Sequence, residues 1–173
     1  NSDGLMAIAV SADGALRDAE VALSKVIASY EPVEQQAVYG AGKKGEISVD
    51  DVYSTLGLIP LNYHPEFLGY LVSNDKNSAL DFVNRIYASG IDLGQFTSGF
   101  VEYLRKVLMY TINPAVLASV GEEMLDQDLK LIAVHSQALT QQQLIRMLSL
   151  FISAKEGMKS SPIPQLPLEL AIL

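Results

Sequence analysis

Arg17 is the residue whose type and place in the sequence most directly suggest chemistry. It stands in the first turn of a helix predicted over residues 15–30, away from the apolar stripe of that helix. A helix N-terminus already carries partial positive charge, so a cation there works against the helix dipole. Such an arginine can meet a bound anion, or it can be solvated or paired with Asp13 or Glu20. The spacing alone leaves both interpretations open.

The two histidines do not predict a metal site. Neither His64 nor His135 has a second ligand three or four residues away, as a helical zinc motif requires. His64 stands directly before Pro65 and is expected to begin a helix. His135 stands at a predicted helix end, where a positive charge is mildly favoured. We expect neither histidine to be catalytic, because neither has a partner group in a recognisable motif.

The acidic pairs and the lysine-rich loop give no catalytic motif either. Asp50–Asp51 and Glu122–Glu123 are sequential, so on a helix their side chains point about 100° apart and do not converge. Gly42-Lys43-Lys44 suggests a phosphate-binding loop, but GxxxxGK[ST] fails because Ala37 and Lys44 occupy its first and last positions. The sequence therefore predicts no catalytic residue and no metal ligand in this chain.

Two predicted helices and the turn between them position Arg17. Asp13 can cap the helix that carries Arg17, and Gly14 ends a shorter helix that Asp3 is expected to cap. The apolar residues that recur at helical spacing behind Arg17 are predicted to form a buried stripe. They are Leu16, Ala19, Leu23, Val26, Ile27 and Tyr30.

A loop and a short helix follow. Glycine, proline and polar residues predict a loop over residues 31–45. Ser48-Val-Asp-Asp51 has the shape of a capping box, and the helix that it opens is expected to end at Leu56-Gly57. Prolines beyond Gly57 mark a junction, so we place a domain boundary there.

The rest of the chain reads as a series of helices without a strand pattern. The predicted helices span residues 65–72, 75–89, 93–113, 122–134, 141 onward and 168–173, with Asp92 and Thr140 opening capping boxes. The side chains expected to face inward are Leu80, Val83, Ile86 and Tyr87, then Leu93, Phe96, Phe100, Leu104, Val107 and Leu108, then Leu144, Leu148, Phe151 and Ile152. The predicted fold class is all-α.

Composition restricts the function. A net charge of −8 argues against a nucleic-acid surface made by this chain alone. The chain has no cysteine, which fits a reducing cytoplasm, and its apolar runs are too short to cross a bilayer. Hydrophobic residues make up 49% and the mean hydropathy is positive, so part of the surface is expected to lie against partners.

Several segments of the sequence resemble segments of a known protein family. Gly14-Ala-Leu-Arg17-Asp18-Ala19, followed by Leu23-Ser-Lys-Val-Ile-Ala-Ser29, resembles the sensor-2 segment in the helical lid of AAA+ clamp-loader ATPases. The most similar version is that of the bacterial DNA polymerase III gamma/tau subunits. In that family the lid arginine reaches the phosphates of the bound nucleotide, and Arg17 is the matching position.

The resemblance continues to the end of the chain. Gly45-Glu-Ile-Ser-Val-Asp-Asp-Val52 matches the end of the lid, and Gly90-Ile-Asp92-Leu-Gly-Gln95-Phe and Ser161-Pro-Ile-Pro-Gln-Leu-Pro-Leu-Glu169-Leu resemble the collar. It implies that residues 1–57 are the last part of an AAA+ lid and residues 58–173 a collar that joins subunits.

The resemblance also implies what the longer parent protein would do. That parent would bind ATP and Mg²⁺ through a P-loop upstream of Asn1, whereas this fragment would bind no cofactor. The parent protein would assemble with other clamp-loader subunits through its collar helices, and its N-terminal domains would contact the sliding clamp and primer-template DNA.

Two other classes of function remain open from the residues themselves. The chain could be a free-standing all-α domain that binds a small molecule or a protein, with a pocket between helices. An enzyme is a more distant third. A GxxxxGK[ST] motif after a strand in the upstream sequence would separate the first interpretation from these.

Overall fold

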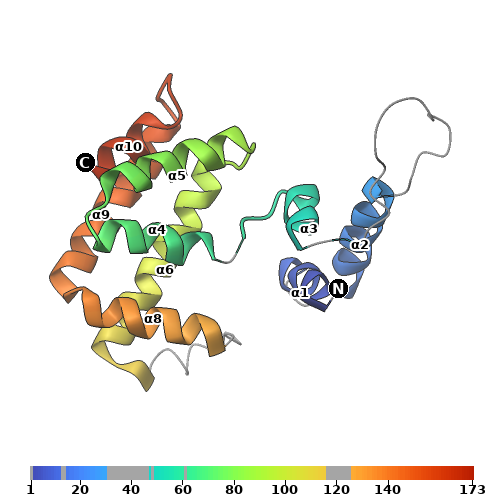
Figure 1. The fold of residues 1–173 in the computed structure, drawn as a ribbon, viewed down its shortest axis with the longest axis horizontal. Helices are drawn as coiled ribbons and strands as arrows, with labels where there is room; N and C mark the ends of the chain where they lie inside the picture. Colours follow the sequence, from blue (N-terminus) through green and yellow to red (C-terminus); the bar gives the residue numbers. More distant parts are fainter. Residues whose placement is uncertain (1, 13–14, 31–46, 48, 61, 116–125) are drawn as a thin grey trace. The chain divides into compact units, whose positions relative to one another are not determined.

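The computed structural model describes residues 2–12, 15–30, 47, 49–60, 62–115 and 126–173. These residues form helices joined by turns, with no strand among them (Figure 1). The all-α prediction is confirmed. The chain divides into two units, Asn1–Pro60 and Leu61–Leu173, which are described separately below.

The first unit contains α1 (Ser2–Ser11), α2 (Leu16–Tyr30) and α3 (Val49–Leu56). The two longer helices pack against each other, and α3 packs against both. A Cβ on Gly4 would lie 3.3 Å from the Cγ2 atom of Val52, so α1 approaches α3 closely there. The buried core is small: Ala7, Ile8, Val26 and Val52, with Ala19, Ala22, Ile47, Tyr53 and Leu56 partly buried around it.

The end of α3 is the one that the sequence predicts. Gly57 has a φ of 67°, the left-handed conformation that glycine adopts without strain. The Leu58 N–H donates to the Tyr53 carbonyl at 2.8 Å, which is the Schellman pattern of a helix C-terminus. The predicted caps at Asp13 and Ser48, Gly14 and the loop over 31–45 lie outside the described residues.

Two predictions about the first unit are wrong. Because α1 already begins at Ser2, Asp3 lies within its first turn and is not its cap. The predicted stripe of α2 is largely exposed: Leu16 is 75% exposed and Ile27 46%, while Val26 is 2% exposed. The reason is that α1 and α3 cover the adjoining face of α2, where Ala19, Ala22 and Val26 lie at i, i+3 and i+7.

The second unit is built around α6. Its described helices are α4 (Tyr63–Val72), α5 (Lys76–Ala88), α6 (Leu93–Ile112), α8 (Asp126–Ala138), α9 (Gln141–Met158) and α10 (Leu166–Ile172). α6 packs against α4, α8 and α9, while α10 packs on α5 and α9 (Figure 1).

All five phenylalanines of the chain meet in the core of this unit. Phe67 of α4 is the centre of the cluster. Its ring centroid lies 5.5 Å from that of Phe82, 5.4 Å from Phe96, 4.8 Å from Phe100 and 5.9 Å from Phe151. None of the five is more than 2% exposed. One cluster of rings therefore joins α4, α5, α6 and α9.

Side-chain caps open three helices, and those at Asp92 and Thr140 were predicted. Asp75 accepts a hydrogen bond from the Ser78 N–H at 3.0 Å, and Asp92 accepts one from the Gln95 N–H at 2.6 Å. Thr140 forms the complete capping box with Gln143.

Other boundaries and faces differ from the prediction. α4 begins at Tyr63 and α10 at Leu166, in both cases two residues before the predicted start. α8 runs to Ala138, and Glu122–Glu123 lie outside the described residues. Tyr87 is 44% exposed and Ile152 45%, although both were expected to face inward. In α5 the buried residues are Ala79, Phe82, Val83 and Ile86, so Tyr87 lies one position beyond the face that the other helices cover.

Candidate functional site

Arg17 is exposed in the first turn of α2. Asp18 follows it in the same turn and complements the helix dipole, whereas Arg17 opposes it. Leu16 beside it is also exposed. Arg17 is thus held on a regular helix with a side chain that is accessible to an anion, and its phosphate role stays a prediction.

His64 lies in the first turn of α4, as expected, but it is packed against α6. Its ring stacks on that of Phe96 with centroids 5.2 Å apart. A Cβ on Gly99 would lie 2.6 Å from the His64 Cε1 atom, so only glycine admits the ring at this distance. Burial is the largest effect on the pKa of His64 and lowers it to about 4. A hydrogen bond with the Phe96 backbone raises the pKa by less, and the positive charge of Lys106 lowers it slightly. His64 is therefore a neutral packing residue at neutral pH.

His135 lies in the last turn of α8, at the helix end where it was expected, but it is 7% exposed. Its Nδ1 atom shares a hydrogen bond of 2.9 Å with the Tyr103 hydroxyl, which ties α8 to α6. Burial lowers the pKa of His135, so its surroundings disfavour the positive charge that a helix end would favour.

The described residues do not assemble a catalytic or metal-binding group. No set of three or more His, Asp or Glu side chains in the described part of the chain lies close enough to hold a metal ion. Asp51 lies half-buried on α3, and the side chain of Asp50 is outside the described set. The described residues do, however, expose many large apolar side chains.

The outer face of α10 is the clearest such surface. Leu168 and Ile172 point into the core, while Leu166, Leu170 and Leu173 lie on the opposite side and are 38%, 63% and 68% exposed. Apart from Glu169, the residues of α10 are apolar, and a helix that is apolar over most of its surface is normally buried over most of it. The sequence predicts a final helix of apolar residues, but it does not predict which of these residues face outward.

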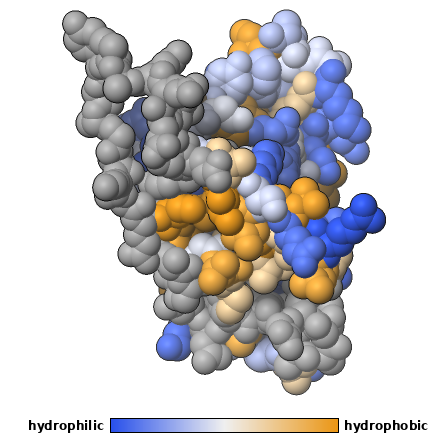
Figure 2. Space-filling view, turned by 90° about the vertical axis from the view of Figure 1, so that its right-hand side faces the viewer, coloured by the Kyte–Doolittle hydropathy of each residue, from blue (hydrophilic) through white to orange (hydrophobic). Residues whose placement is uncertain are grey.

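Further exposed apolar side chains extend this character. In the second unit they include Leu131 and Val134 of α8, Ile145 and Ile152 of α9, and Ile163 before α10. In the first unit they include Leu5, Met6, Leu16, Val21 and Ile27. Figure 2 shows hydrophobic side chains exposed on the surface that faces right in Figure 1. Single exposed apolar residues are ordinary, but a complete helix face of them indicates a binding surface.

One comparison with known proteins agrees with the resemblance, over residues 47–173. None of the helices in the described residues is long and apolar enough to span a bilayer. Comparison with individually curated proteins gives no match. A family model described as DNA polymerase III subunits gamma and tau domain III matches residues 47–173, from just before α3 to the last residue. Because this match covers most of the chain, the chain belongs to the family of DNA polymerase III subunits gamma and tau, whose domain III it contains.

Proposed function

We propose that residues 58–173 are a collar through which subunits of a clamp loader assemble. In this proposal the apolar outer face of α10 packs against a neighbouring subunit, and the parent protein uses ATP to place the sliding clamp on primed DNA. The role of this chain in the proposal is to hold subunits together.

The observation that carries the proposal is the exposure of Leu166 and Leu170 on α10, and of Leu173 directly after it, on a helix whose other side is already buried. Burying apolar surface stabilises by roughly 25 cal/mol per Å², so a row of three leucines favours association. The family match supports the same assignment, because it includes α10 and all the other described helices of the second unit.

The first unit has a different proposed role. We infer that residues 1–57 are the end of an AAA+ lid and that Arg17 contacts nucleotide phosphate in the parent protein. The support is the accessible cation in the first turn of α2 together with the resemblance around it. The exposed apolar residues of α1 and α2 fit a lid that continues into further structure. Arg17 lies outside residues 47–173, so the family match does not extend to it.

The experiment is to map assembly onto the two parts of the chain. A chain of residues 58–173 and a chain of residues 1–57 are each mixed with the partner clamp-loader subunits, and co-purification is measured with circular dichroism as a check of folding. We expect residues 58–173 to stay helical and to co-purify. If they fold but associate with nothing, while residues 1–57 associate, the collar assignment is wrong.

A further inference from the structure

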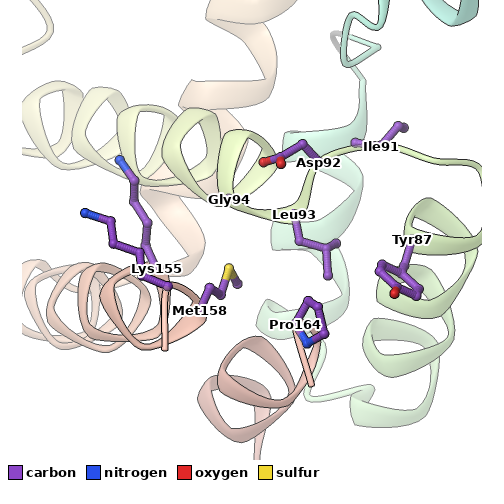
Figure 3. Close-up of a pocket in the computed structure, with 9 residues that line it drawn as sticks. Tyr87, Ile91, Asp92, Leu93, Gly94, Lys155, Met158 and Pro164 are labelled. Atoms are coloured by element: carbon purple, nitrogen blue, oxygen red, sulfur yellow. The ribbon is translucent and has the colours of Figure 1, made fainter. Parts of the chain in front are cut away.

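A cavity on the second unit is not used by the proposed assembly surface. It measures about 360 Å³ and lies between the turn from α5 to α6, the last turn of α9 and the segment before α10. Figure 3 shows Tyr87, Leu93, Met158 and Pro164 around one space, with Lys155 on its flank and Asp92 at its edge. The volume is at the lower end of the range for ligand sites, about the size that one or two large side chains need.

Apart from Asp92, Lys155 and Lys159, the residues that line the cavity are apolar. Leu93 is buried, whereas Tyr87 is 44% exposed. The residue before Tyr87 in α5, Ile86, is completely buried. Met158 supplies a flexible, polarisable side chain that adapts to the shape of an occupant. These walls favour an apolar group that enters from outside.

The charge at the cavity is the opposite of that of the whole chain. Lys155 and Lys159 are exposed and both line the cavity, in a chain whose net charge is −8. The two are four residues apart at the end of α9, so their ammonium groups repel each other. The ion pairs described for this unit join Arg85 to Glu66 and Arg105 to Glu102, and neither of the two lysines takes part in them.

The only carboxylate among the lining residues is already engaged. Asp92 accepts the Gln95 N–H at 2.6 Å as the cap of α6. Asp92 keeps its negative charge while it caps α6, so with Lys155 and Lys159 at its edge the cavity lining has two positive charges and one negative, a net positive charge that a carboxylate from outside could neutralise.

We propose that this cavity docks an acidic peptide segment of a partner protein, which places an apolar side chain between Tyr87, Leu93 and Met158 and its carboxylates on Lys155 and Lys159. An inorganic anion would leave the apolar walls exposed, and a neutral apolar ligand would leave the net positive charge of the lining uncompensated. An acid next to an apolar side chain satisfies both features.

The test uses the 173-residue chain with ¹³C-labelled methionine methyl groups and two probe peptides. One is acetyl-Asp-Glu-Leu-Phe-amide, and the other is its uncharged counterpart acetyl-Asn-Gln-Leu-Phe-amide. Titration at low salt should shift the Met158 methyl resonance, and the acidic peptide should bind about ten-fold more tightly, because it gains two surface charge pairs.

Variants separate the cavity from general charge attraction. Lys155→Glu with Lys159→Glu should abolish the advantage of the acidic peptide, whereas Lys130→Glu with Arg146→Glu makes the same charge change away from the cavity and should keep it. Tyr87→Ala should weaken both peptides. The proposal is overturned if the acidic peptide causes no shift at millimolar concentration, if both peptides bind equally, or if either the double lysine variant or Tyr87→Ala leaves binding unchanged.

Discussion

His64 illustrates how a residue that suggests chemistry can serve packing instead. Its ring lies on Phe96 and against Gly99, and burial lowers its pKa to about 4 from the ordinary value of 6.5. The unfolded chain therefore binds a proton between these two pH values that the folded chain does not. The sequence does not predict this contact, because Gly99 and Phe96 belong to another helix and lie more than thirty residues from His64.

This pKa shift predicts a pH dependence of stability. The free energy of unfolding should be highest above pH 6.5 and should fall as the pH drops from about 6.5 to about 4, by roughly 3 kcal/mol from His64. His135 acts in the same direction, since burial lowers its pKa too. Urea denaturation of wild type and His64→Leu across this range measures the effect. A difference between the two proteins that stays constant from pH 7.5 to 4 would contradict it.

Arg17 carries the other prediction at the scale of a residue. Because its side chain is exposed, Arg17→Ala creates no cavity and should leave folding and subunit assembly intact. In the parent protein it should weaken ATP-dependent clamp loading, since one charge-assisted phosphate contact is worth on the order of 1.5–3 kcal/mol. The check is the rate of ATP hydrolysis and of clamp loading, with Lys25→Ala as an exposed control on the same helix. Unchanged rates would make Arg17 an ordinary surface residue.

At the scale of elements, Phe67 is the residue on which four helices converge. Its ring contacts phenylalanines of α5, α6 and α9, and it is completely buried. Phe67→Ala should lower the free energy of unfolding by about 3–5 kcal/mol, measured by chemical denaturation. Tyr110→Ala, a partly exposed aromatic on α6, should cost much less. Similar losses for the two variants would show that the ring cluster is not the core.

The sequence predicts elements better than faces. The caps at Asp75, Asp92 and Thr140 and the stop at Gly57 depend on hydrogen bonds within a few residues, so they can be read locally. Which side of a helix is buried depends on what packs against it. The stripe of α2 and the inward position of Ile152 were wrong for that reason, because apolar spacing does not distinguish a core from a surface awaiting a partner.

For the whole molecule, the fold class and the family follow from the sequence, and the division of the chain remains a prediction. The family match begins at residue 47, whereas the contacts divide the chain after Pro60 and the predicted boundary follows Gly57. The assignment of α3 differs between these criteria. It packs on α1 and α2 in the first unit, but it belongs to the segment that the family model matches.

The outer face of α10 is where the account as a whole can be tested. If this face joins subunits, a charge placed on it should prevent assembly without unfolding the protein. A buried unpaired charge costs several kcal/mol, and Leu170 is 63% exposed in the single chain, so the cost would arise only on association. Leu168→Asp, on the buried side of the same helix, should instead unfold the domain.

The measurement is co-purification of the full-length Leu170→Asp parent with its partner subunits, with circular dichroism as a check of folding. Asn84→Asp, an exposed change on α5, serves as a control for the added charge. The account predicts that Leu170→Asp keeps its helical signal and loses its partners, while Asn84→Asp assembles normally. A folded Leu170→Asp protein that assembles as well as wild type would contradict it.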